Sequence, residues 1–212
     1  MRYDAPALAR TNRNPESRPR IVEAAWRRVA KEGVHGATMR GIAAEAGVTT
    51  GFVTHYFEDK EDLLVEVVRH NNLRARDRVV EKIGTSRGLV ALEGAVEALL
   101  PIDADTRREW QVGLACWGPT TPGAQAAKEL RGGWRILEKM LASLLEQAIE
   151  DGELPDTVDV PFEAGRLVTM IAGVGMLAGI ETPERIRRDA KRMLATQIAS
   201  LDRAEPGVEV QR

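Results

Sequence analysis

Apolar residues recur along most of this chain at intervals of three and four positions, the spacing that lines one face of an α-helix. The first such segment covers about residues 19–31, where Ile21, Ala25 and Val29 follow the spacing and Gly33 is expected to end the helix. The sequence has no sustained alternation of apolar and polar residues of the kind that would indicate a pair of strands. The pattern predicts an all-α protein with about nine helices.

Capping residues and helix breakers predict where the other helices begin and end. Thr38, Thr49 and Asp59 suit N-cap positions, because their side-chain oxygens can accept hydrogen bonds from the first backbone N–H groups of a helix. Gly47 separates two short helices, and Pro183 stands at the favoured first position of the last helix. The predicted spans are about 39–46, 50–56, 60–83, 87–100, 106–117, 124–150, 161–179 and 182–202.

Charge is distributed unevenly between the two ends of the chain. Residues 1–57 contain nine Lys and Arg against five Asp and Glu, whereas the whole chain has a net charge of −2. The remainder is therefore acidic. A basic N-terminal segment on an acidic body favours contact with DNA at one end, although a solvated basic tail without function has the same composition.

Three features predict a cytoplasmic protein that does not enter a membrane. Cys116 is the only cysteine, so no internal disulfide can form, as expected in a reducing compartment. The arginines near the N-terminus are not followed by the apolar stretch of a signal peptide. The longest apolar run, residues 167–180, is shorter than the roughly 20 residues that a membrane-spanning helix needs.

Residues 39–57 have the composition of a helix-turn-helix motif, in which two short helices meet at a steep angle over a tight turn. Ala43 is the small residue expected where the helices touch, and Gly47 can adopt the positive φ that the turn needs. Four apolar residues would hold the second helix in place: Ile42, Ala46, Val48 and Val53. An ordinary helical hairpin with a glycine turn is the alternative.

The chain resembles the DNA-binding segment of the TetR family of transcriptional regulators over residues 36–64, GATMRGIAAEAGVTTGFVTHYFEDKEDLL. One departure is Thr54, where the family often has Tyr. The string TTGFVTHYF and the later tryptophans are closer to the betaine-pathway, BetI-type branch. The resemblance implies a repressor that binds a palindromic operator as a homodimer and is released by a small molecule. The matching positions are Thr38, Ile42, Ala43, Ala46, Gly47, Val48, Gly51, His55, Tyr56, Phe57, Lys60, Leu63 and Leu64.

Candidate DNA contacts lie on and beside the second short helix. Thr50 and Thr54 carry hydroxyl and methyl groups suited to base edges, and Gly51 lets the backbone approach the duplex. By resemblance, Lys60 binds a phosphate. His55, Tyr56 and Phe52 have the alternative of packing within the domain. The complete set is Thr38, Arg40, Thr49, Thr50, Gly51, Phe52, Thr54, His55, Tyr56 and Lys60.

The resemblance also implies an effector cavity between the fourth and eighth helices. Candidate ligand-binding residues are Trp110, Cys116, Trp117, Trp134 and Met170. Tryptophan faces attract cations, so a quaternary amine such as choline is the candidate effector if the BetI-type likeness holds. The alternative for each tryptophan is ordinary core packing.

The last two predicted helices are candidates for a dimer interface. The eighth is apolar around most of its circumference and rich in Gly and Ala, which permits close backbone approach. The ninth has one apolar face and one strongly basic face. The alternative is an intramolecular core. The candidate interface residues are Phe162, Met176, Ile186, Met193, Leu194 and Ile198.

These patterns divide the chain into a flexible basic arm (1–17), a helix-turn-helix domain (18–59), a ligand-binding and dimerisation domain (60–203) and a flexible tail (204–212). An enzyme is disfavoured, because His35, His55 and His70 are scattered and no phosphate-binding glycine loop is present. We expect no cofactor and no metal. A helical small-molecule-binding or scaffold protein without DNA activity is the alternative function.

Overall fold

The structure, a computed structural model, describes residues 16–117 and 123–201. Within these ranges the chain forms nine helices and no strand, which confirms the all-α prediction. Residues 1–15 of the predicted arm and the whole predicted tail lie outside the described residues. The helices are α1 (Ser17–Gly36), α2 (Met39–Ala46), α3 (Thr50–Tyr56), α4 (Lys60–Ile83), α5 (Gly88–Leu99), α6 (Ala104–Ala115), α7 (Gly123–Glu150), α8 (Val160–Leu177) and α9 (Pro183–Leu201).

Side-chain caps explain where several helices begin. The oxygens of Thr38, Thr49 and Asp59 each accept a hydrogen bond, 2.9–3.2 Å long, from the backbone N–H three residues later, so α2, α3 and α4 begin where predicted. α6 begins two residues earlier than predicted. Asp103 accepts from the Thr106 N–H at 2.8 Å while the Thr106 hydroxyl accepts from the Asp103 N–H at 3.1 Å, a reciprocal cap that the prediction missed.

Gly33 interrupts α1 instead of ending it. Its φ of 69° and ψ of 176° are not helical, yet the chain makes one further turn, in which the Ala37 N–H donates to the Gly33 carbonyl at 3.1 Å. The prediction that the first helix stops at Gly33 therefore holds only for its regular part. The extra turn buries Val34 in the core.

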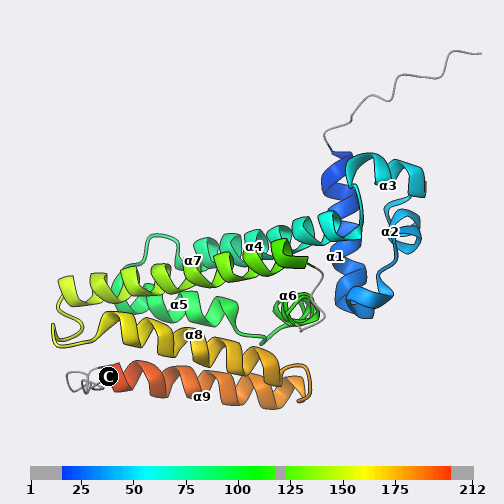
Figure 1. Cartoon of the computed structure of the whole chain (residues 1–212). Coiled ribbons are helices and arrows are strands. Elements are labelled where there is room, and N and C mark those ends of the chain that lie inside the picture. Colours follow the sequence, from blue (N-terminus) through cyan, green and yellow to red (C-terminus); the bar gives the residue numbers. More distant parts are fainter. Residues whose placement is uncertain (1–15, 118–122, 202–212) are drawn as a thin grey trace, which may run out of the picture.

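Helices α1, α2 and α3 form a three-helix unit at one end of an elongated molecule (Figure 1). Its buried core includes Trp26, Val53 and Phe57, each no more than 1% exposed. Val112 and Cys116, from α6 and its C-terminal end, are buried in the same cluster, as are residues of the first half of α4. The apolar core of this unit therefore continues beyond residue 59, and α4 and α6 connect it to the rest of the molecule.

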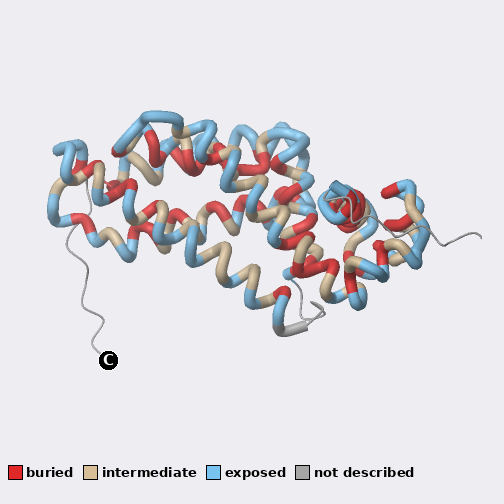
Figure 2. The backbone as a smooth tube through the Cα atoms, turned by 90° about the horizontal axis from the view of Figure 1, so that it is seen from above, coloured by how far each residue is buried: buried red, intermediate tan, exposed pale blue. Residues whose placement is uncertain are grey.

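The larger part of the molecule is a bundle of α4, α5, α7, α8 and α9, with α6 lying between it and the three-helix unit (Figure 1). The buried residues of each helix gather on its inner side (Figure 2). This follows from the helical spacing of apolar positions seen in the sequence. The largest fully buried side chains of the bundle are Leu92, Leu100, Leu141, Leu145, Leu167, Ile171 and Leu201.

By length and composition alone, α8 passes the test for a membrane-spanning helix among the described residues, with a mean hydropathy of 1.3. The core helix of a water-soluble bundle passes the same test. Leu167, Ile171 and Val174 of α8 are buried against the neighbouring helices, which is the behaviour of a bundle helix.

Candidate nucleic-acid interface and effector cavity

Gly47 makes the corner between α2 and α3. Its φ of 66° and ψ of 35° lie in the left-handed region, which costs other residues about 1–2 kcal/mol. The next N–H, of Val48, donates to the Ala43 carbonyl at 2.9 Å and closes the turn. Ala43 and Val53 are buried, so α3 is held against the core by the residues that the sequence predicted.

The opposite face of α3 points to solvent. Thr50, Gly51, Thr54 and His55 are all exposed. A Cβ atom added at Gly51 would meet no atom within 4 Å, so the backbone of α3 is uncovered at that point. This row can be approached by a ligand without moving the core.

Two of the predicted DNA-contact residues also cap helices. The hydroxyls of Thr38 and Thr49 accept the capping hydrogen bonds of α2 and α3, which leaves the hydroxyl hydrogen of each to donate to a phosphate. Arg40 is exposed in the first turn of α2, and Lys60 is partly exposed at the first residue of α4. Both side chains are therefore accessible to a phosphate.

Phe52 and Tyr56 lie partly in the domain core. Their ring centroids are 5.3 Å apart, and the ring of His55 meets Tyr56 edge-on at 5.4 Å. Both Phe52 and Tyr56 pack against the buried cluster of the three-helix unit and are half-buried. Each can therefore support the fold and still present an edge to a ligand.

A cavity of about 540 Å³ lies between α4, α6 and α7, and Leu99 of α5 and Ile171 of α8 also line it. This volume is in the range of sites for drug-sized ligands. Its wall is mostly apolar, with a small number of amide and charged groups. The polar residues of the wall are Arg69, Asn71, Asn72, Arg76, Arg78, Glu109 and Glu129.

Three tryptophans form a contiguous part of the cavity wall. The ring of Trp134 lies 6.1 Å from that of Trp110 and 5.6 Å from that of Trp117, measured between centroids. The Trp110 indole N–H donates to the Leu99 carbonyl at 2.8 Å, which fixes its ring. The structure thus places Trp110, Trp117 and Trp134 together at the cavity.

Both carboxylates of the cavity wall are neutralised by arginines. Glu109, which is 5% exposed, accepts two hydrogen bonds of 2.6 Å from the guanidinium of Arg78. Glu129 accepts one of 2.6 Å from Arg69. A ligand therefore meets aromatic faces and ion pairs, and meets no lone negative charge among the described residues of the wall.

Two of the predicted ligand-binding residues do not line this cavity. Cys116 faces the other way, into the core of the three-helix unit, because Trp110, Gly113 and Trp117 take the cavity side of the same segment. Burial raises the pKa of the Cys116 thiol to about 11. Met170 packs on the core of the bundle. Their prediction as pocket residues is corrected accordingly.

Sequence reasoning missed the polar residues of the cavity. Asn71, Arg78 and Glu109 lie inside segments that read simply as amphipathic helices, and one sequence does not show which polar residues face inward. The adjacent Asn71 and Asn72 in the middle of a long helix were the one available signal, since asparagine is a poor helix former.

The predicted dimer residues fall into two groups. Phe162, Met176 and Met193 are exposed by 60, 57 and 47% on the outer faces of α8 and α9. Ile186 and Leu194 are buried within the bundle, and Ile198 is partly buried against it. Ile186 and Leu194 are corrected to intramolecular packing, because the apolar face of α9 turns toward α5 and α8, whereas Ile198 keeps part of its surface exposed.

Comparison with known proteins gives these features a family. Residues 21–67 match the family described as bacterial regulatory proteins of the tetR family, and residues 90–202, more than half of the chain, match the family of BetI-type transcriptional repressors, C-terminal. The chain belongs to the TetR family, in its BetI-type branch. This TetR-family protein is therefore a DNA-binding transcriptional repressor and not an enzyme.

Relatives and solved structures agree with this assignment. The chain is 29% identical to the HTH-type transcriptional regulator PksA of Bacillus subtilis, over 87% of this chain and 89% of that protein. It is 31% identical to the regulator BetI of Klebsiella pneumoniae, over 49% of this chain and 54% of that protein. A crystal structure of a transcriptional regulator from Rhodococcus sp. Rha1 has a TM-score of 0.76 at 25% identity, covering 91% of this chain and 99% of that one.

A second similar structure was solved with a ligand bound. It is a transcriptional regulator from Saccharomonospora viridis in complex with choline, which is 28% identical to this chain and has a TM-score of 0.76. The similarity covers 86% of this chain and 97% of that one.

Proposed function

We propose that this TetR-family repressor reads its operator with the exposed row of α3, binds it as a homodimer and leaves it when a small molecule fills the cavity. The observation that carries the DNA-reading part is the exposure of Thr50, Gly51, Thr54 and His55 on a helix that is anchored by the fully buried Val53. A short helix whose inner face is anchored in the core and whose outer face is exposed can enter a major groove. Access to chromosomal DNA implies a cytoplasmic location.

The test of DNA reading uses an operator selected by the protein from random duplexes. Thr50→Ala should change the base preference at one or two positions, since each lost base contact costs about 1–3 kcal/mol of discrimination. Thr85→Ala is the control, because Thr85 is an exposed threonine in the turn after α4, outside both the three-helix unit and the proposed dimer faces. Identical preference profiles for the wild type and Thr50→Ala would remove Thr50 from the interface.

Dimerisation is proposed through the outer faces of α8 and α9. Phe162, Met176, Ile180 and Met193 leave large apolar surfaces uncovered in the single chain, and Ile180 is 81% exposed. A two-fold pair of such faces buries them and places two recognition helices on one side of the DNA, which is why a palindromic operator is expected.

The dimer proposal is tested by size-exclusion chromatography with light scattering, which measures the molar mass of the purified protein. Met176→Glu should shift the mass toward that of one chain, because a charge would be buried without a partner. Val80→Glu is the control, since Val80 is equally apolar and 63% exposed but lies on α4. A dimer that survives Met176→Glu at micromolar concentration would place the interface elsewhere.

A quaternary amine is the effector class that two observations favour. Three tryptophans line the cavity, and a structural neighbour at 28% identity is a choline complex. Because both wall carboxylates are ion-paired, the cation would be attracted by tryptophan faces, each worth roughly 0.5–2 kcal/mol.

The effector proposal is tested with a charged ligand and its neutral isostere. Choline should quench or shift the tryptophan fluorescence and release the operator, and 3,3-dimethylbutan-1-ol, which has the same shape without the charge, should do so more weakly. Equal or stronger binding of the alcohol would show that the cavity selects apolar volume and not a cation. Gly113→Leu, which adds volume where a Cβ meets nothing within 4 Å, should abolish both responses.

A further inference from the structure

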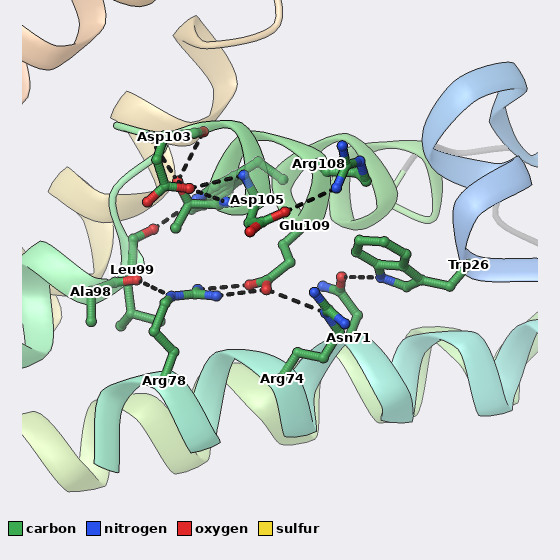
Figure 3. A network of polar contacts seen from close by, with 12 residues as sticks. Trp26, Asn71, Arg74, Arg78, Ala98, Leu99, Asp103, Asp105, Arg108 and Glu109 are labelled. Atoms are coloured by element: carbon green, nitrogen blue, oxygen red, sulfur yellow. Dashed lines mark hydrogen bonds and ion pairs between the residues drawn. The ribbon is translucent and has the colours of Figure 1, made fainter. Parts of the chain in front are cut away.

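The buried carboxylate of Glu109 lies between two arginines of α4 (Figure 3). On one side, Arg78 of the cavity wall holds it with two hydrogen bonds of 2.6 Å and also donates to the Ala98 carbonyl at 2.6 Å. On the other side, the Nε of Arg74 is 3.5 Å from a Glu109 oxygen. Arg78 is therefore held by short hydrogen bonds, whereas Arg74 has only longer ion pairs, to Glu109 at 3.5 Å and to Glu23 at 4.0 Å.

Arg74 faces the DNA-binding unit. Its guanidinium lies 4.5 Å above the ring of Trp26, the largest buried side chain of α1. The Nε of Arg74 is buried and has no hydrogen-bond partner among the described residues. A displacement of the Glu109 carboxylate by less than 1 Å would supply one.

Trp26 is also tied directly to the cavity wall. Its indole N–H donates to the Oδ1 of Asn71 at 2.8 Å, and Asn71 lines the cavity. The two residues on which Trp26 rests, Asn71 and Arg74, are thus one turn apart on α4. A change in the pairing of Arg74 would therefore alter the surroundings of the Trp26 ring, which packs between α1 and α4.

We propose that Glu109 is a positioning residue that couples the occupancy of the cavity to the orientation of the DNA-binding unit. This inference rests on the proposed release by a small molecule and names the side chains that transmit it. In this structure Glu109 is held by Arg78. A ligand that displaces Arg78 leaves a buried carboxylate that must be compensated, and Arg74 is the donor within reach.

The consequence for α1 follows from geometry. A closer pairing of Arg74 with Glu109 changes the position of its guanidinium over the ring of Trp26, and with it a buried contact between α1 and α4. Two alternative pairings of one carboxylate form the kind of discrete two-state element that energetic coupling between distant sites requires.

The test measures coupling without any ligand. Arg78→Met should imitate the filled cavity, so it should weaken operator binding by roughly 2- to 30-fold. It should also shift the ¹⁵N–¹H indole resonance of Trp26, although Arg78 does not contact this residue. The resonance is assigned by its disappearance in Trp26→Phe. Arg76→Met is the control, since Arg76 also lines the cavity but hydrogen-bonds its chain neighbour Asp77.

A double-mutant cycle gives the decisive result. In an Arg74→Met background, the effect of Arg78→Met on operator affinity should largely disappear. If Arg78→Met does not fold, Arg78→Gln takes its place. Glu109→Gln, a neutral isostere, removes the charge that draws Arg74, so in this background a change at Arg78 should move neither the Trp26 resonance nor the operator affinity. Full additivity, or a Trp26 resonance that moves no more than in Arg76→Met, would overturn the role of Glu109.

The proposal and the proposed function fail in different ways. Non-additivity between Arg74 and Arg78 in a protein that no ligand removes from DNA would refute release by an effector and keep the coupling through Glu109. Release of the operator by choline, together with additive effects of the Arg74 and Arg78 variants on operator affinity, would support release by an effector and refute the coupling through Glu109.

Discussion

The indole ring of Trp110 on α6 lies directly against the backbone of Gly175 on α8, so closely that a Cβ atom at position 175 would overlap the ring. The same indole donates to the Leu99 carbonyl, so α5 and α8 together set the position of this ring in the cavity wall. The cavity therefore has this shape only because position 175 of α8 is a glycine.

Gly175→Ala should lower the free energy of unfolding by about 1–3 kcal/mol, because the added methyl group must displace Trp110 or α8. It should also change the tryptophan fluorescence. Gly113→Ala on α6 is the control. A Cβ at position 113 is unobstructed, so this variant should keep or raise stability by up to about 1 kcal/mol through helix propensity. Equal stability of the two variants in urea titrations would contradict the close contact.

Gly47 and Gly51 should respond differently to the same substitution. Gly47→Ala should cost about 1–2 kcal/mol of stability, because position 47 has a positive φ. Gly51→Ala should leave the thermal midpoint unchanged or higher, since position 51 is helical and open. It should nevertheless weaken operator binding if the backbone of α3 approaches the DNA. Unchanged operator affinity of Gly51→Ala would show that the duplex does not come close at this point.

Lys60→Ala should weaken binding to every DNA sequence and lower the slope of log affinity against log salt by about one. The physical reason is the loss of one neutralised phosphate at the start of α4. Lys139→Ala removes an exposed lysine of α7 and is the control. Fluorescence anisotropy at several salt concentrations measures the slope, and the same slope in wild type and Lys60→Ala would exclude a phosphate contact.

Glu66 predicts a pH dependence of stability. Burial alone would raise the pKa of Glu66, but hydrogen bonds from Arg18 and Arg69 outweigh it and hold the pKa below the ordinary value of 4.5. Its contribution is therefore complete above pH 4.5 and is lost as the pH falls further. Glu66→Gln should destabilise the protein by up to about 1 kcal/mol at pH 7 and by less near pH 3.5, as measured by denaturant unfolding. A difference that does not shrink at low pH would contradict this origin.

The Cys116 thiol should resist alkylation in the folded protein. Burial raises its pKa to about 11, so little thiolate exists at pH 8, and the side chain is 1% exposed. Iodoacetamide should modify an exposed cysteine introduced by Ser143→Cys many times faster, and both sites should react alike in denaturant. Since the folded state disfavours the thiolate, stability should also decline as the pH rises above 9. Rapid labelling of native Cys116 would show that α6 opens away from the three-helix unit.

Local chemistry in the sequence was sufficient for the DNA-binding half. Thr38, Thr49 and Asp59 act on backbone groups three residues away, and Gly47 acts on its own φ, so their effects are visible without knowing the fold. The reciprocal cap of Asp103 and Thr106 is equally local, since it joins residues three positions apart, although a helix that starts at Thr106 does not include it.

The amino-acid sequence by itself determined the nine helices, the glycine corner and the outward row of α3, because these depend on spacing and on neighbours along the chain. Only the tertiary structure decided that Glu109 stands between Arg78 and Arg74, that Cys116 faces the three-helix unit, and that Ile186 and Leu194 are core. Those placements depend on which side of a helix meets another helix distant in the chain. An amphipathic pattern gives the direction of burial and leaves the partner open.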